Sequence, residues 1–381
     1  MDIPDIRPLL LDGDYHPAFD RQGSPDPERF GQLAADFISS GSDAITVPCA
    51  DSALVQAAVS VAGGRVPVGG LIPPSNLELV PFGTTTFEHL IAHYRDQMRV
   101  YADAGLSFVI LDGFTGIADL RAALFAARPF DLKVFVIMEV ADECRTAVRD
   151  ADVLAALIVA EAMGAAAFGV TASGGAKPLI PALERLYPYA SIPLIARADA
   201  GCPNPVLEHL YDLSPRSMAG ETELLLEAGA QIIGGRNGVT PEHITAMKET
   251  VQGFDFGRLQ KMQPEYELLA ANHREAFFIP QAPEISEPLS CTLDMSEALM
   301  ETADLIGIDV IAVSIVGIDD AHLLAENAHM ATLPILIHCD DEAALEQALL
   351  HYQGRALVDS QSFIPPERLA QIAARYGAIV Y

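Results

Sequence analysis

Eight short apolar runs, each followed by a longer helical pattern, constrain the fold of this chain more than any other feature of its sequence. The apolar residues of each run are consecutive rather than alternating, which is typical of parallel strands covered on both faces. The runs lie at residues 8–13, 43–49, 66–72, 108–114, 133–139, 166–172, 192–200 and 230–238. Eight strand-and-helix units within about 250 residues predict an α/β fold of the (β/α)₈ TIM-barrel type.

A doubly wound sheet is the main alternative, and it fits less well. Such a sheet normally has fewer units and a glycine-rich phosphate turn after its first strand. The first run here is followed by Asp-Tyr-His-Pro at 14–17, without a G-x-G-x-x-G pattern. The eighth unit continues into a typical helix start, with Thr240 as candidate N-cap and Pro241 in the first turn.

A second region follows a proline-containing stretch. The sequence FIPQAPEISEP at 278–288 indicates a linker, which we place at 278–290, after a barrel domain at 1–277. Four further apolar runs, each preceded by an amphipathic helix, lie at 309–316, 333–339, 355–360 and 378–381. They predict a smaller parallel α/β half-barrel domain at 291–381. Because an open parallel sheet has faces and edges to cover, we expect this domain to pack on the barrel or to form a homodimer.

Charge and cysteine usage limit the partners and the compartment. The chain of 381 residues has 52 acidic and 23 basic residues, a net charge of -29. This excess disfavours nucleic acid and anionic membrane surfaces as partners. No run is long enough for a membrane span, and MDIPDIRPLL lacks a secretory signal pattern. Five cysteines without a C-x-x-C pair are typical of reduced thiols, so we expect a cytoplasmic protein.

Polar residues stand where the predicted strands end, which is where TIM barrels carry their working groups. We predict catalytic roles for Asp112, Glu139 and Arg236. The predicted substrate-binding residues are Asp12, Cys49, Thr171, Arg197, Asp199 and Asn237.

Each of these residues also has a structural interpretation. Asp12 and Asp112 are equally suited to capping a turn. Arg197 and Asp199 share one face of a strand and can pair with each other, and Cys49 can serve as a small apolar side chain. Glu139 ends an apolar run, so it is either paired with a base such as Arg197 or has a perturbed pKa.

Arg236 and Asn237 give the sharpest signal of a ligand. They stand at the last strand end between glycines, in GGRNGVTPEHI at 234–244. TIM barrels often bind an anion in the loops after strands seven and eight, with help from a helix N-terminus. A fixed guanidinium and backbone N–H groups near Gly238 are suited to that role.

GGRNGVTPEHI resembles the G-G-C-C-G-T-x-P-E-H-I signature of the homocysteine S-methyltransferase family, which includes the first barrel of cobalamin-dependent methionine synthase. LLLDGDYH, VPVGGLIPP, LDGFTGIADLRAAL, AAFGVTASGG and ADAGCPN resemble further segments of that family. In the family, three thiolates hold a zinc ion that binds the homocysteine sulfur. The matching positions here are Ala172, Arg236 and Asn237. The resemblance therefore implies the family's barrel without its zinc site, so that methyl transfer to a thiol is metal-independent, altered or lost.

The second region resembles part of the pterin-binding barrel that follows the first barrel in methionine synthase. LPILIHCDDEAALEQALLHYQGRALVDSQS is similar to its strands, but His338 stands at an aspartate position and Asp359 at an asparagine position. Half of that barrel is missing. The resemblance thus implies no resident cofactor, and folate or a corrinoid enters only through a partner.

Three kinds of function remain open from the sequence. The first is an S-methyltransferase-like enzyme acting on an amino-acid thiol or another small anion, with Arg236 supplying positive charge. The second is a non-catalytic binding partner of a corrinoid or folate methyltransferase system. The third is a lyase or isomerase that binds an anionic substrate through arginine.

Overall fold

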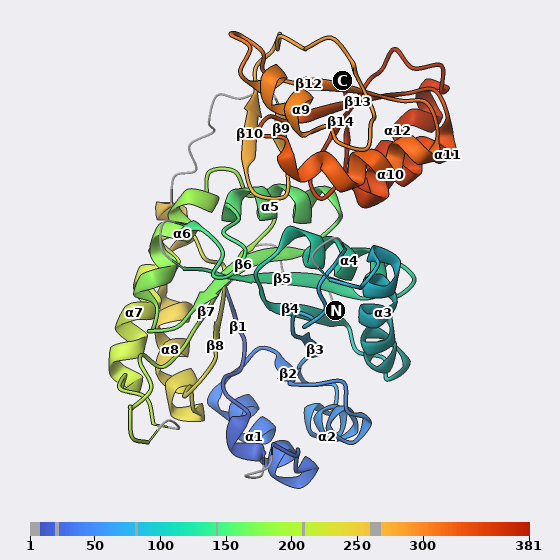
Figure 1. The fold of residues 1–381 in the computed structure, drawn as a ribbon. Coiled ribbons are helices and arrows are strands. Elements are labelled where there is room, and N and C mark those ends of the chain that lie inside the picture. The colour runs from blue at the N-terminus through green and yellow to red at the C-terminus, as the bar shows by residue number, and fades with distance from the viewer. Residues whose placement is uncertain (1–7, 20–22, 81–82, 142–143, 208–209, 260–267) are drawn as a thin grey trace.

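The structure is a computed structural model that describes residues 8–19, 23–80, 83–141, 144–207, 210–259 and 268–381. Eight parallel strands form one curled sheet in the order β1-β8-β7-β6-β5-β4-β3-β2 (Figure 1). Each strand lies within a predicted run, which confirms the predicted fold class. The strands are β1 (Leu9–Leu10), β2 (Ile45–Val47), β3 (Val68–Ile72), β4 (Phe108–Phe114), β5 (Lys133–Glu139), β6 (Ala167–Ala172), β7 (Leu194–Ala198) and β8 (Ile232–Gly235).

One backbone hydrogen bond and two carboxylates join the chain at the two ends of this order, near β1 and β2. The Asp43 N–H donates to the Leu10 carbonyl at 2.7 Å, and the Leu10 N–H donates to the Asp43 carboxylate at 3.0 Å. The N–H and hydroxyl of Thr46 both donate to the Asp12 carboxylate. Carboxylates therefore connect the strands where a regular backbone ladder does not.

Eight α-helices follow the strands of the barrel and surround its sheet. They are α1 (Pro27–Ser40), α2 (Ser52–Ala62), α3 (Phe87–Asp103), α4 (Ile117–Ala127), α5 (Val153–Ala162), α6 (Ile180–Leu186), α7 (Pro215–Glu227) and α8 (Pro241–Gly253). Thr240 is the N-cap of α8 and Pro241 its first residue, as predicted. Short 3₁₀ helices lie at His16–Ala18, Lys177–Leu179 and Phe256–Arg258.

Alternate strand residues fill the barrel interior. One apolar cluster joins side chains from seven of the strand regions; its buried members are Leu11, Ala44, Phe108, Ile110, Phe135, Ile137, Ala167, Ile195 and Ile232. Because side chains alternate along a strand, the next interior positions toward the carboxyl ends are polar. They are Asp112 on β4, Glu139 on β5 and Arg197 on β7, and on β6 the interior position after Gly169 is Thr171. The same periodicity that fills the core therefore directs these residues to the barrel mouth.

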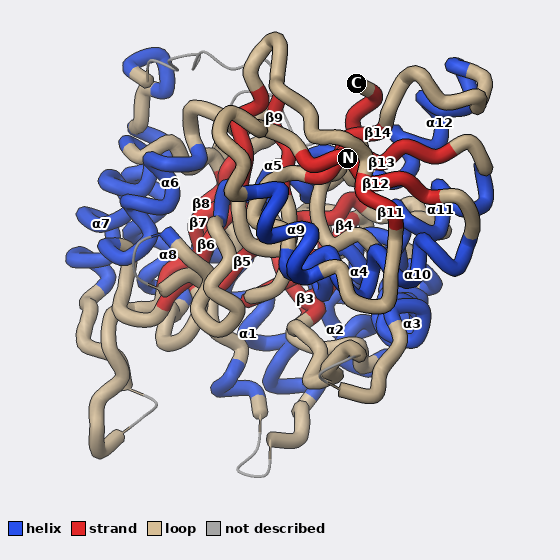
Figure 2. Tube along the Cα trace, turned by 45° about the horizontal axis from the view of Figure 1, so that its top comes forward, coloured by secondary structure: helices blue, strands red, loops and turns tan. Residues whose placement is uncertain are grey.

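A second, five-stranded parallel sheet follows the barrel, with its strands in sequence order. Figure 2 shows these strands and the helices beside them. The strands are β11 (Leu289–Ser290), β12 (Ile311–Ile315), β13 (Ile335–Cys339), β14 (Leu357–Val358) and β15 (Ile379–Val380). The helices are α9 (Ser296–Ala303), α10 (Ile318–Asn327), the 3₁₀ turn Ala328–Met330, α11 (Glu342–His351) and α12 (Pro366–Tyr376). Four strands match the four predicted runs, and β11 lies in the stretch interpreted as a linker.

An antiparallel hairpin that the sequence did not predict covers one face of this second sheet. Its strands are β9 (Leu268–Ala271) and β10 (Ala276–Ile279). Ala270 and Ile279 of the hairpin pack in one cluster with Val310, Leu336 and other residues of the second sheet. The hairpin therefore buries an apolar face that an open half-barrel would otherwise expose.

The second sheet and its helices, here called the second unit, dock on the barrel through Arg121 of α4. This side chain is 1% exposed, and its guanidinium donates to the carbonyls of Leu349 and Gly354, both at 2.8 Å. Burial lowers the pKa of Arg121, and the carbonyls at the end of α11 compensate part of the lost hydration. The expectation that this region packs on the barrel is met, whereas the homodimer stays a prediction. Within the described residues, no helix is both long and apolar enough to cross a membrane.

Candidate functional site

Three of the predicted site residues stand at one level of the barrel. Glu139 is the register partner of Thr171, Thr171 is that of Arg197, and Arg197 is that of Gly234. Register partners on neighbouring parallel strands point to the same face of a sheet. Glu139, Thr171 and Arg197 therefore form a polar layer directly above the apolar interior.

Arg197 is held by two acceptors at this level. Its guanidinium donates to the Asp112 carboxylate at 3.1 Å and to the Gly235 carbonyl at 2.8 and 3.1 Å. The Arg197 side chain is 2% exposed and that of Asp112 is 15% exposed, so the pair is largely buried. A Cβ atom on Gly234 would lie 3.1 Å from Cγ of Arg197, so glycine makes room for the arginine. Arg197 thus pairs with Asp112 rather than with Asp199 or Glu139.

The turn after β8 places Arg236 beside Thr171. The Arg236 guanidinium donates to the Thr171 hydroxyl oxygen at 2.8 Å, and this hydroxyl donates to the Arg197 carbonyl at 2.8 Å. The turn needs a glycine at 238, where φ is +76°, and the Gly238 N–H donates to the Asp14 carboxylate at 2.9 Å. The guanidinium is therefore positioned by both the turn and the neighbouring strand.

Asp199 and Asn237 form a second pair at the mouth. The Asn237 amide donates to the Asp199 carboxylate at 3.1 Å. Burial raises the pKa of Asp199, although nearby Arg236 and the Asn237 hydrogen bonds act in the opposite direction. The pair places an amide and a partly desolvated carboxylate next to the Arg236 charge.

Asp12 connects strands rather than capping a turn. The side chain is fully buried and accepts from Thr46, as described above. Burial raises its pKa to about 6, while the Arg197 charge and the Thr46 hydrogen bonds oppose that rise. The Tyr15 hydroxyl is also buried beside it, and burial together with the Asp12 charge raises the pKa of Tyr15. Asp12 therefore lies beneath the mouth, within the electrostatic field of Arg197.

The side chains of Glu139 and Cys49 form no hydrogen bond or ion pair with another predicted residue in the part of the chain that the structure describes. The Glu139 carboxylate is half-buried and has no hydrogen-bond or ion-pair partner among the residues that the structure describes. It lies near Gly113, whose φ is +78° at a bulge in β4. Burial and the Asp51 charge raise the pKa of the half-buried Cys49 thiol, which favours its neutral form.

Tyr211 is a residue of the mouth that the sequence did not indicate. A Cβ atom on Gly238 would lie 2.3 Å from its ring, so the ring packs on the glycine of the β8 turn. Burial raises the pKa of Tyr211, with contributions from the Asp199 and Asp14 charges. It belongs to the long loop between β7 and α7, and no periodicity or motif in that loop marks it.

The donor atoms at the mouth do not fit a zinc site of the family's kind. Ala172 has no donor atom, a guanidinium donates hydrogen bonds but ligates no metal, and Asn237 is engaged with Asp199. In the described part of the chain, no three His, Cys, Asp or Glu side chains are grouped so that they could hold a metal ion. Cys202 is exposed on the β7–α7 loop, and its sulfur lies near Gly174.

The fold and the mouth define a TIM barrel whose carboxyl-end face carries an arginine, an amide and several carboxylates. A family model for homocysteine S-methyltransferase matches residues 26–251. The chain therefore belongs to the homocysteine S-methyltransferase family, and the resemblance seen in GGRNGVTPEHI is confirmed.

Curated relatives include two methionine synthases. The protein of Mycobacterium leprae (strain TN) is 23% identical over 355 residues, which cover 83% of this chain and 29% of that protein. The protein of Mycobacterium tuberculosis (strain ATCC 25618 / H37Rv) is 24% identical with the same coverage. This chain thus spans 29% of the length of these relatives.

A solved structure shares the barrel fold. The apo form of the homocysteine methyltransferase MmuM from Escherichia coli superposes with a TM-score of 0.54 at 15% sequence identity. The match covers 65% of this chain and 97% of that one. At this identity the likeness is one of fold.

Proposed function

We propose that the barrel mouth binds a small amino-acid thiol of the homocysteine type and transfers a methyl group to its sulfur without a zinc ion. Arg236 carries this proposal. Its guanidinium is fixed by Thr171 at 2.8 Å, and among the described residues no further acceptor bonds it. Its remaining N–H groups are available to an anion, and a guanidinium near a thiol lowers the pKa of that thiol.

Glu139 supplies the complementary charge. Glu139 is the register partner of Thr171, and Thr171 accepts a hydrogen bond from Arg236. The Glu139 carboxylate itself has no hydrogen-bond or ion-pair partner in the described residues. An amino-acid thiol carries both a positive amino group and a group that becomes negative. Glu139 accepts the thiol proton, and Arg236 binds the thiolate.

Asp112 and the remaining predicted residues have supporting roles in this scheme. One oxygen of the Asp112 carboxylate is buried and has no hydrogen-bond partner among the described residues, while the other is paired with Arg197. Through that pair, Asp112 holds Arg197 in place in the polar layer. In this scheme Thr171, Arg197, Asp199 and Asn237 position the substrate with Arg236, Asp12 supports Arg197 from below, and Cys49 remains a predicted substrate-binding residue.

The reaction balances without a metal. The thiolate sulfur attacks the methyl carbon of a sulfonium donor, and the electron pair of the broken carbon–sulfur bond stays on the departing thioether. The thiol proton remains on Glu139. Arg236 stabilises the thiolate before attack, a weaker activation than direct zinc ligation gives.

An Arg236→Gln variant tests the proposal, with Arg216→Gln as matched control because Arg216 is exposed on α7, remote in sequence from the β8 turn. We expect the wild type to methylate homocysteine from a sulfonium donor in the presence of EDTA. R236Q should lower kcat/KM by about 100-fold, which is the typical effect of removing one hydrogen-bond donor that stabilises negative charge in an enzyme active site. R216Q should leave kcat/KM unchanged. Stoichiometric zinc in the purified protein, or activity abolished by EDTA, contradicts the metal-free mechanism.

A second candidate function is binding of a protein partner that carries the methyl group, such as a corrinoid protein. The β7–α7 loop beside the mouth exposes apolar side chains, with Val206 85% and Leu210 48% exposed. Single exposed apolar residues are common, but three on one loop next to a mouth, Val206, Leu207 and Leu210, favour a contact surface. A Val206→Ser variant would then slow methyl transfer from a protein-bound donor and leave homocysteine binding unchanged.

A further inference from the structure

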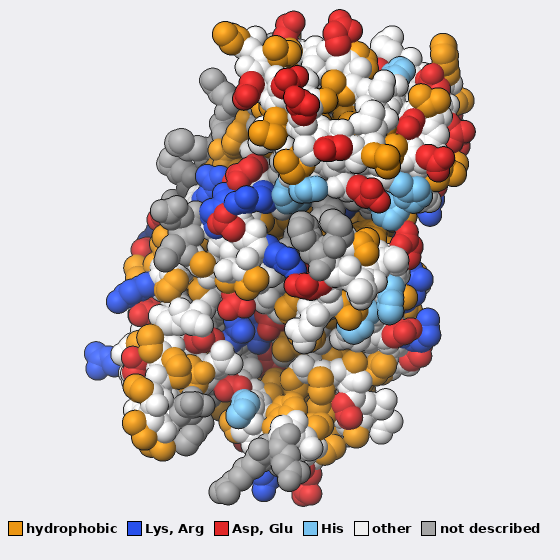
Figure 3. Space-filling model, in the orientation of Figure 1, with side chains coloured by type: hydrophobic (Ala, Val, Ile, Leu, Met, Phe, Trp, Pro, Cys, Tyr) orange, Lys and Arg blue, Asp and Glu red, His pale blue; other side chains and the backbone are white. Residues whose placement is uncertain are grey.

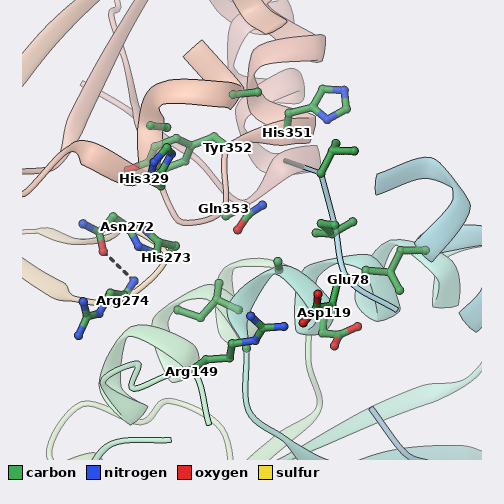
Figure 4. A pocket seen from close by; sticks show the side chains of 18 of the residues that line it. Glu78, Asp119, Arg149, Asn272, His273, Arg274, His329, His351, Tyr352 and Gln353 are labelled. Atoms are coloured by element: carbon green, nitrogen blue, oxygen red, sulfur yellow. Dashed lines mark hydrogen bonds between the residues drawn. The ribbon is translucent and has the colours of Figure 1, made fainter. Parts of the chain in front are cut away.

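A cavity of about 450 Å³ lies between the barrel and the second unit. The loops after β3, β4 and β5 line it on one side, and the hairpin turn and the ends of α10 and α11 line it on the other (Figure 4). Histidine and basic side chains gather along the junction of the two units (Figure 3). Its volume is within the range of small-molecule sites, which often lie at domain interfaces. No residue of the mouth described above lines it.

One wall of the cavity is apolar. Leu77 and Leu79 follow β3, Leu90 comes from α3 and Ile117 begins α4. These side chains can contact the hydrocarbon body of a ligand, and they can bind it without hydrogen bonds. The apolar wall does not determine the charge of the ligand. That charge depends on the polar residues that line the cavity.

Three polar side chains lining the cavity lack partners. Arg149, His273 and Gln353 have no hydrogen bond or ion pair to any other residue of the described segments. Arg149 comes from the barrel, and the other two come from the hairpin turn and the end of α11. The stem of Arg149 passes over Gly116, where a Cβ atom would lie 3.3 Å from its Cγ. Polar side chains without hydrogen-bond partners therefore face the cavity from both units.

The acidic side chains of the cavity limit the charge of that acceptor. Asp119 accepts from the Tyr94 hydroxyl at 2.7 Å and from the Ser75 hydroxyl at 3.0 Å, and Asp150 pairs with Arg274. Glu78 and Glu326 also line the cavity and are exposed. In a chain of net charge -29, these carboxylates repel a dianion or polyanion. The Arg149 charge already acts on Asp119, where it opposes the rise that burial causes in the pKa of that carboxyl, so a single further negative charge is the most that Arg149 can bind.

This geometry points to a second binding site, for a small amphipathic monocarboxylate with an aromatic or branched aliphatic body. The carboxylate accepts hydrogen bonds from Arg149, His273 and Gln353, and the body lies against Leu77 and the apolar wall. Burial, with the Arg274 and His329 charges, lowers the pKa of His273, so the imidazole is neutral near pH 7 and keeps one N–H donor. A ligand held by both units stabilises their docking.

Isothermal titration calorimetry of the full chain with 4-phenylbutyrate tests this site. We expect a dissociation constant below about 1 mM for 4-phenylbutyrate and no binding of inorganic phosphate. Arg149→Gln should weaken 4-phenylbutyrate binding about tenfold, because it removes a charge-assisted hydrogen bond. Arg99→Gln is the matched control, since Arg99 is an exposed arginine of α3 paired with Asp96.

The Arg236→Gln variant separates this site from the mouth. It should leave 4-phenylbutyrate binding unchanged even if methyl transfer is lost, so the two proposals fail independently. Absence of binding, an equal loss in R149Q and R99Q, tighter binding of phosphate than of 4-phenylbutyrate, or loss of binding in R236Q overturns the assignment.

Discussion

The Asp12 carboxylate forms a hydrogen bond between two strand regions that lack a regular backbone ladder. It accepts the Thr46 N–H between β1 and β2, at the cost of a buried charge. Its pKa rises from 3.8 to about 6, so the folded state holds this proton at pH values where the unfolded chain has released it. The contribution of Asp12 to stability is therefore greatest below about pH 4 and falls as the pH rises through about 6.

An Asp12→Asn variant tests this linkage, because asparagine does not titrate. Between about pH 4 and pH 7, the free energy of unfolding of the wild type should fall relative to that of D12N by up to about 3 kcal/mol. Urea unfolding across that range measures the difference. Asp36→Asn, at an exposed carboxylate of α1, is the control and should show no such trend. A parallel pH dependence of wild type and D12N would contradict the assigned role.

Several features of single residues followed from the sequence, and others did not. Strand periodicity indicated that Asp112, Thr171 and Arg197 lie at one end of the barrel, because burial alternates along each strand, while their roles stay predictions. The partner of each side chain depended on contacts between distant strands. Arg197 pairs with Asp112, 85 residues away, and no local pattern distinguishes that acceptor from Asp199. Tyr211 was missed for the same reason.

At the scale of elements, α4 and α11 are joined by the buried guanidinium of Arg121. An Arg121→Met variant keeps the apolar stem but leaves the Leu349 and Gly354 carbonyls without a donor. We expect a loss of about 2–4 kcal/mol in the free energy of unfolding and faster proteolysis between the two units. Thermal unfolding and limited proteolysis measure these effects.

Arg65→Met is the matched control for this helix-end contact. Arg65 also donates to carbonyls at the end of a helix, those of Val61 and Ala62 in α2, but it is exposed. Its loss should cost well under 1 kcal/mol, because water replaces the donor. Equal destabilisation by R65M and R121M would show that burial at the docking surface is not what makes Arg121 important.

The sequence predicted the strands of both parallel sheets well, and it predicted the hairpin not at all. Parallel strands buried on both faces have consecutive apolar residues, so their pattern is local. The β9–β10 hairpin is short, and its turn, at 272–275, has no glycine. The hairpin is stabilised by packing on the apolar face of the second sheet, whose strands lie beyond residue 288. The local sequence of the hairpin does not contain that information. The same dependence on distant residues explains why β11 was interpreted as part of a linker.

For the whole molecule, α5 ties the stability of the barrel to that of the second unit. Its residues Val153–Ala160 are all buried, although a helix on the outside of a barrel normally has a polar face. The β9–β10 hairpin packs on α5 and covers the face of this helix that would otherwise contact solvent. A chain ending at residue 259 would therefore expose Leu154, Leu157 or other apolar residues of this helix.

We expect this truncated chain, 1–259, to aggregate or to bind a dye for exposed apolar surface, whereas the full chain unfolds in one cooperative transition. The expectation follows from burial: each large apolar side chain left uncovered loses about 1.5–3 kcal/mol of favourable transfer energy, so a few of them approach the stability of a typical domain. Size-exclusion chromatography and calorimetry of both chains measure the difference. A soluble, monomeric truncated chain with the cooperative melting of the full chain would instead mean that the barrel folds independently and that the second unit is only attached to it.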